Sequence, residues 1–96
     1  MTNFMPSKET MAKAKVLRSP ELIEILKKME LGWNLRVSVN GGSYYLMEMG
    51  HPMETVSVRK FRTLAAAGLI IPRVYDDYTE YNLTYDPSKQ SIKDIV

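Results

Sequence analysis

Positive charge gathers at the start of the segment SVRKFRTLAAAGLI, residues 57–70. Arg59, Lys60 and Arg62 are cationic there, and Thr63 adds a hydroxyl group. If the segment is a helix with its apolar residues turned inward, all four side chains share the outer face of its first two turns. Cationic side chains beside the free amides of a helix N-terminus are suited to phosphate groups. The spacing therefore indicates binding of a polyanion such as DNA.

Each of these side chains has an expected role in that binding. Arg59 and Lys60 are expected to contact phosphates, and Arg62 a phosphate or a base edge. Thr63 is expected to make a hydroxyl contact. A solvated outer face is also ordinary for Arg and Lys in any helix, so a purely structural explanation of the cluster stays open.

The same segment carries the signals of a helix over residues 57–67. Ser57 is a capping residue, and Gly68 tolerates the left-handed conformation that ends helices. Leu69 is expected to fold back as an apolar contact after the cap. The predicted buried stripe consists of four apolar residues: Val58, Phe61, Leu64 and Ala65.

A second source of positive charge is the N-terminal segment, residues 1–18. It carries four cations against one acid: Lys8, Lys13, Lys15, Arg18 and Glu9. Two interpretations stay open, a flexible or disordered basic arm and a weak helix capped by Ser7, with a thin stripe of Met11, Ala14 and Leu17. In both, Lys13, Lys15 and Arg18 are expected to extend the DNA contact.

A firmer helix signal lies in SPELIEILKKMELG, residues 19–32. Ser19 is a good cap, Pro20 suits the first helical position, and Gly32 can end the helix. The predicted buried stripe consists of Leu22, Ile25 or Leu26, and Met29.

Alternating apolar and polar residues then predict a strand over residues 33–39 and a hairpin turn at Asn40-Gly41-Gly42. The return strand has two possible registers. A two-residue turn, which we prefer, places Tyr44 and Leu46 on the face of Trp33. A three-residue loop places there instead a different set: Tyr45, Met47 and Met49. The Gly50-His51-Pro52 segment is expected to break the strand.

A second hairpin is predicted about Asp76-Asp77, with strands before and after it. Its register places Arg73 opposite Glu80 on the outside. The expected inner face consists of Val74, Tyr81 and Leu83. Residues 86–96 are expected to form a C-terminal tail, with a turn at Asp86-Pro87 and one weak helix.

These elements define an α+β domain over residues 19–85, with two main helices and two β-hairpins that form a small antiparallel sheet. Over residues 32–84 the chain resembles small winged-helix-like proteins of bacteria, phages and mobile elements. The matching features are the LGW opening, the hairpin ending in YYL, the helix closing on AAAGLI and the final hairpin ending in YNLT. The resemblance implies that helix 57–67 is a recognition helix that enters the DNA major groove.

The chain departs from the pattern of that family in two ways. A hairpin over residues 33–49 stands where winged helices have a short second helix. The second hairpin also carries negative charge at or beside its tip, from Asp76, Asp77 and Glu80, which disfavours contact with phosphate. These departures put the supporting geometry and the use of the wing in doubt.

The alternative hypothesis is a protein-interaction or homodimerisation module of unknown partner, in a protein encoded by a mobile element. Tyrosine and methionine are common at such interfaces. The candidate residues are Tyr44 or Tyr45, Tyr75, Tyr78, Met47, Met49 and Met53. A homodimer also fits the DNA-binding hypothesis, because a face with so few cations binds weakly.

Other function classes find little support in the 96 residues. Net charge is only +2, so DNA binding depends on a local patch. Cysteine is absent, and the single histidine, His51, has no partners that suggest a nucleophile and base, so we expect no enzymatic activity, metal site or cofactor. No apolar run approaches the roughly 20 residues of a membrane span, and the N-terminus lacks the apolar core of a secretory signal. We therefore expect a cytoplasmic protein that does not enter membranes.

Overall fold

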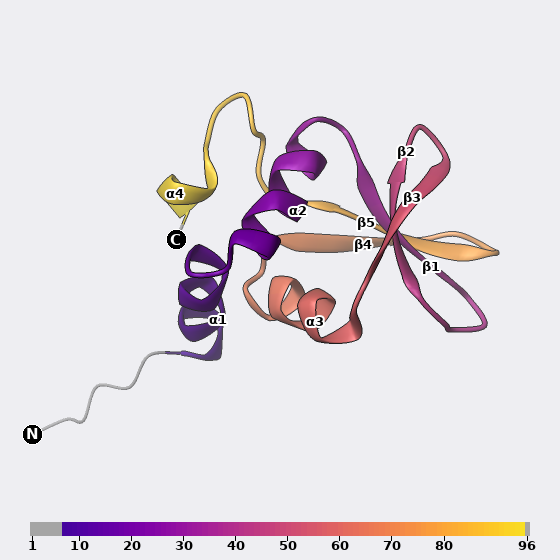
Figure 1. Ribbon diagram of the computed structural model, residues 1–96, viewed down its shortest axis with the longest axis horizontal. Helices are drawn as coiled ribbons and strands as arrows, with labels where there is room; N and C mark the ends of the chain where they lie inside the picture. The colour runs from indigo at the N-terminus through magenta and orange to yellow at the C-terminus, as the bar shows by residue number, and fades with distance from the viewer. Residues whose placement is uncertain (1–6, 96) are drawn as a thin grey trace, which may run out of the picture.

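The computed structural model describes residues 7–95, and its helices and strands are shown in Figure 1. The first six residues of the predicted basic arm and the last residue of the predicted tail lie outside this range. The elements follow in the order α1 (Lys8–Leu17), α2 (Pro20–Glu30), β1 (Asn34–Ser38), β2 (Tyr44–Glu48), β3 (His51–Val56), α3 (Val58–Ala66), β4 (Ile70–Val74), β5 (Tyr78–Leu83) and α4 (Ile92–Ile95).

The five strands form one antiparallel sheet in the order β3-β2-β1-β5-β4. The central strand β1 joins the two predicted hairpins, since Leu35 pairs with Leu46 on one side and with Tyr81 on the other. The predicted α+β class and the single antiparallel sheet are confirmed. The element counts differ from the prediction, because the described residues contain three helices of nine residues or more, the short α4 and a fifth strand.

The unpredicted strand is β3, which follows the expected break. Met49 and Gly50 adopt positive φ angles of 49° and 82°, so they form a tight turn and the chain returns along β2. Pro52 removes one hydrogen-bond donor, but β3 is an edge strand, where a proline is tolerated. The predicted break of the return strand is therefore confirmed, since β2 ends at Glu48, but the new strand that begins at His51 was not predicted.

The preferred orientation of the first return strand is confirmed. Leu35 and Leu46 pair directly and are both fully buried, and Tyr44 stacks on Phe61 with ring centroids 4.0 Å apart. The loop itself is longer than a two-residue turn, since β1 ends at Ser38 and β2 begins at Tyr44. The strand pairing is the same as a two-residue turn would give, so each side chain still lies on the predicted face of the sheet.

One core holds the helices against the sheet. The predicted buried stripe of α2 is confirmed. Leu22 and Met29 are buried, and so are both candidates for the middle position, Ile25 and Leu26. Ser19 caps this helix by accepting a hydrogen bond from the Leu22 amide at 3.2 Å. Phe61 of α3 packs between Tyr44 and Tyr81 of the sheet, the latter at 4.7 Å in an edge-to-face arrangement. Each fully buried side chain of this size contributes about 1.5–3 kcal/mol of transfer free energy.

Helix α1 belongs to the same core. Ser7 caps α1 through a 3.1 Å hydrogen bond from the Thr10 amide, and Ala12 and Val16 are buried. Of the two interpretations of this segment, the structure therefore shows a helix over Lys8–Leu17 that packs on the core. The predicted stripe of Met11, Ala14 and Leu17 is wrong, because all three side chains are exposed and the helix turns its Ala12 side inward.

The buried stripe of α3 also differs from the prediction in part. Phe61 and Leu64 are buried as expected, but Val58 is 44% exposed and Ala65 is exposed. Ala67 is fully buried instead. Contacts with the core thus run along every third residue, and Ala65 lies about 100° around the helix from Leu64.

The second hairpin has the predicted register, with Arg73 opposite Glu80. Val74 shares a side with Tyr81, but it is 76% exposed because it lies near the hairpin tip, away from the core. Its predicted burial is wrong. The C-terminal segment adds to the core through Tyr85 and Ile92, both buried.

Candidate functional site

Helix α3 presents the predicted cationic residues on its outer side. The Lys60 amide donates a 3.2 Å hydrogen bond to Ser57 Oγ, which confirms the predicted cap. Arg59 and Arg62 are exposed and lie in no ion pair with a carboxylate of residues 7–95. Both guanidinium groups are therefore free to bind an external anion.

The end of α3 is held closely against α1. Gly68 has a φ of 71°, and a Cβ atom there would lie 2.9 Å from Glu9 Oε1 of α1. Leu69 is fully buried, as the predicted helix stop requires. Figure 1 shows α1 and α3 side by side, and Gly68, two residues after the end of α3, lies against Glu9 of α1. The orientation of α1 beside α3 is therefore fixed by burial of Ala12 and Val16 and by the close approach of Glu9 to Gly68.

Two grooves join the cations of α1 to those of α3. A groove of about 260 Å³ between the two helices is lined by Lys8, Lys15 and Arg62. A second groove, of about 520 Å³, lies where the ends of α1, α2 and α3 meet, and Lys15, Arg59 and Lys60 line it. Lys15 borders both grooves, so the positive surface is continuous. We call Lys8, Lys15, Arg59, Lys60 and Arg62 the α1–α3 face.

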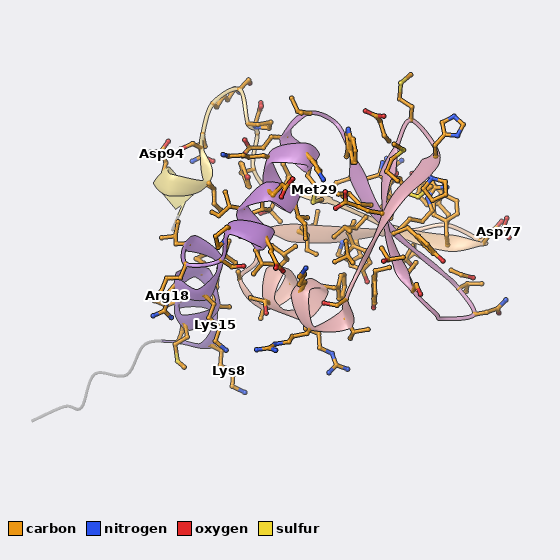
Figure 2. All side chains as sticks on the ribbon, viewed as in Figure 1. Lys8, Lys15, Arg18, Met29, Asp77 and Asp94 are labelled. Atoms are coloured by element: carbon orange, nitrogen blue, oxygen red, sulfur yellow. The ribbon has the colours of Figure 1, made fainter. Side chains whose placement is uncertain are left out.

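Figure 2 agrees with this arrangement. Lys8 and Lys15 lie at the lower end of α1, on the side toward α3, and nitrogen-tipped side chains project from the lower side of α3. Asp77, at the tip of the β4–β5 hairpin, lies at the opposite end of the molecule. The aspartates of the predicted wing therefore do not neutralise the α1–α3 face.

One cation of this face is already paired with a carboxylate. Lys60 Nζ lies 2.6 Å from Glu21 Oε2, at the start of α2. This hydrogen bond and the charge of Lys60 hold the pKa of Glu21 below its ordinary value. The face therefore presents four free cations and one ion pair, and a phosphate must compete with Glu21 for Lys60.

The structure brings Thr63 to the same surface, where it lines both grooves. Its hydroxyl group donates a 3.1 Å hydrogen bond to the carbonyl oxygen of Arg59, one helical turn earlier. The hydroxyl proton is thus used within the helix, and Thr63 presents lone pairs rather than a donor to the groove.

Two predicted contact residues are not brought to this face. Lys13 pairs with Glu9 at 3.2 Å on another stripe of α1. Arg18 follows the last turn of α1 and lies on the left of that helix in Figure 2, away from α3. Neither residue lines the two grooves. Lys8, a cation of the same predicted basic arm, lines the groove between α1 and α3 instead.

Within the part of the chain that the structure describes, no group of three or more histidine, cysteine, aspartate or glutamate side chains is able to hold a metal ion. None of the described helices has the length and apolar character needed to cross a lipid bilayer.

Comparison of the chain with protein-family models, with curated proteins and with solved structures finds no match.

Proposed function

We propose that this protein binds duplex DNA through the α1–α3 face. The observation that supports the proposal most is the shared lining of the two grooves. Lys8 and Lys15 lie near the start of the sequence, and Arg59 and Arg62 lie more than 40 residues later. The fold nevertheless brings all four side chains to the two connected grooves. Four exposed cations on one side of the molecule form the kind of local patch that a chain of net charge +2 needs for binding DNA.

The winged-helix interpretation belongs to the same proposal, with α3 as the helix that enters the major groove. The family's short second helix is replaced by strands, but α1 packs beside α3 and gives it a helical support. The acidic tip of the β4–β5 hairpin keeps that wing away from phosphates. The proposed contacts therefore come from the two helices.

The proposed contacts are electrostatic with some capacity for base readout. Arg59 and Arg62 offer planar guanidinium groups, which bind phosphate with two parallel hydrogen bonds or read the O6 and N7 atoms of guanine. Lys8 and Lys15 supply point charges beside them. Neutralising four phosphates gives a log–log salt slope of about −3.6 on duplex DNA. Binding is thus expected to be weak at physiological salt and strong at low salt, whether the protein acts as a sequence-tolerant or as a regulatory DNA-binding protein.

The test is charge reversal on α3. We expect the double variant Arg59→Glu with Arg62→Glu to abolish binding of a fluorescent duplex at about 50 mM salt, because it removes two of four free cations and adds two anions. The matched control is Lys27→Glu with Lys89→Glu, two exposed lysines outside both grooves. Both double variants change the net charge from +2 to −2, since each substitution contributes −2.

The control variant is expected to bind DNA nearly as the wild type does, and circular dichroism should show an unchanged fold for both. Equal losses in the two double variants would mean that net charge, not the α1–α3 face, drives binding. Absence of any binding by the wild type at low salt would end the proposal.

A further inference from the structure

A separate surface lies on the face of the sheet turned away from the core. Residues alternate along a strand, so Leu35 of β1 faces the core while Arg36 faces the other side. On that side a groove of about 330 Å³ is lined by Arg36, Tyr45, Met47, Pro52, Asp77 and Tyr78. Met47 is 6% exposed yet lies outside the core cluster, so it forms the floor of this groove. We call this surface the sheet groove.

Arg36 is held in the sheet groove with an unused hydrogen-bond donor. Its guanidinium group stacks on Tyr78, 3.9 Å from the ring centroid, and its Nε atom is buried without a hydrogen-bond partner. No carboxylate of residues 7–95 lies within ion-pair distance of it. The stacking fixes the guanidinium plane, and Arg36 has no carboxylate partner in the described part of the chain, so it is available to an anion from outside.

The lining of the sheet groove also includes an anionic residue, Asp77. Asp77 is exposed, and its carbonyl oxygen accepts a 3.0 Å hydrogen bond from the Val39 amide, which ties the hairpin tip to the neighbouring loop. Its carboxylate pairs with no cation whose side chain the structure describes, Arg36 included. One surface thus presents an unpaired cation and an unpaired anion at separate positions.

Apolar side chains also lie on this face of the sheet. Tyr45 is exposed and lines the groove beside Met47, and Ile71 of β4 is exposed on the same side by its register. Exposed apolar side chains beside a groove are common at protein interfaces. Both edge strands contain a proline, Pro52 in β3 and Pro72 in β4, which disfavours pairing through the sheet edges. The face of the sheet is therefore the better surface for association.

We propose that a second copy of this chain docks on the sheet groove in a two-fold symmetric dimer, with Arg36 of each copy paired with Asp77 of the partner subunit. In a two-fold interface the same patch meets itself, so a patch must supply both members of each pair. The sheet groove does so, with one cation and one anion beside an apolar floor. A nucleic acid is disfavoured here, because Asp76, Asp77 and Glu80 repel phosphate. This dimer is independent of the DNA-binding proposal and uses the opposite end of the molecule (Figure 2).

The first measurement is the mass in solution by multi-angle light scattering, over a concentration series into the hundreds of micromolar. The wild type is expected to reach twice the chain mass of 11.0 kDa. A wild type that stays at the mass of one chain throughout the series overturns the proposal, and this result does not depend on any variant.

Charge exchange then tests the contact itself. Arg36→Asp and Asp77→Arg should each be monomeric, because each homodimer would bring two like charges together twice. An equimolar mixture of the two variants should regain the dimer mass, since both contacts of the mixed dimer join opposite charges. The control Lys27→Asp, on α2, should dimerise as the wild type does.

The other outcomes contradict the proposal. Dimers that persist in both single variants place the interface elsewhere, and a mixture that stays monomeric shows that Arg36 and Asp77 do not meet across it. Binding of a single-stranded oligonucleotide that is lost in Tyr45→Ala, with the wild type monomeric, would assign the sheet groove to nucleic acid instead. Circular dichroism of each variant checks that it is folded.

Discussion

The ion pair between Lys60 and Glu21 allows the DNA-binding proposal to be tested by a gain of affinity. Lys60 Nζ lies 2.6 Å from Glu21 Oε2 within the groove that Arg59 also lines. The pKa of Glu21 is held below its ordinary value by this hydrogen bond, so the carboxylate stays charged at every pH used for DNA binding. The substitution Glu21→Gln removes that charge and frees Lys60 as a fifth cation.

The expected magnitude follows from the count of free cations. Four neutralised phosphates give a slope of about −3.6, so the affinity of the wild type should fall about 150-fold between 50 and 200 mM salt. Five give a slope of about −4.5 and a fall of about 500-fold over the same range. Glu21→Gln is therefore expected to bind DNA more tightly than the wild type at 50 mM salt and to lose affinity more steeply.

The assay is fluorescence anisotropy with one labelled duplex at five salt concentrations. Glu24→Gln is the matched control, because Glu24 is another exposed acid of α2 but pairs with Lys28, at 3.6 Å, away from the α1–α3 face. The control should keep the slope of the wild type. An affinity and slope of Glu21→Gln equal to those of the wild type would refute the placement of DNA over this groove.

Two further predictions concern stability. Val16→Ala removes a fully buried side chain of α1 and should lower the free energy of unfolding by about 2 kcal/mol. It should also weaken DNA binding, because α1 carries Lys8 and Lys15; an unchanged urea midpoint would mean that α1 is not docked. Tyr85→Phe removes the 2.6 Å hydrogen bond that the Tyr85 hydroxyl donates to Glu30 Oε2, and should cost about 1 kcal/mol in the same assay. Full stability of this variant would show that the bond contributes nothing.

Local signals in the sequence predicted the helices well. Ser19 and Ser57 are strong caps before apolar residues at helical spacing, and both helices begin where these residues stand. The return strand could be oriented because Leu35 and Leu46 both require burial. Such features depend on residues close together in the chain, which the sequence displays directly.

Features that depend on residues far apart in the chain could not be predicted from the sequence. A Gly-His-Pro segment signals a break, and only the edge position of β3 allows Pro52 to stand inside a strand. The inward side of α1 is set by its packing on α3, which buries Ala12 rather than Met11. Val58 has the right spacing for burial but lies where nothing covers it fully.

The candidate site was predictable on α3 and less so on α1. The outer face of α3 follows from helical periodicity and the burial of Phe61 and Leu64. The pairing of Lys60 with Glu21 joins residues of different helices, and no local pattern reveals it. The exchange of Lys13 and Arg18 for Lys8 likewise follows from the rotation of α1 about its own axis, which only the packed structure defines.

The DNA-binding proposal requires α1 and α3 to act together through one face. Its most direct test is titration of the ¹⁵N-labelled protein with a short duplex at low salt, observed as amide chemical-shift changes. We expect the largest chemical-shift changes in both helices, at Lys8, Lys15, Arg59 and Arg62, and unchanged chemical shifts for the amides around Tyr45 and Tyr78. Changes confined to the sheet, or limited to one of the two helices, would contradict it.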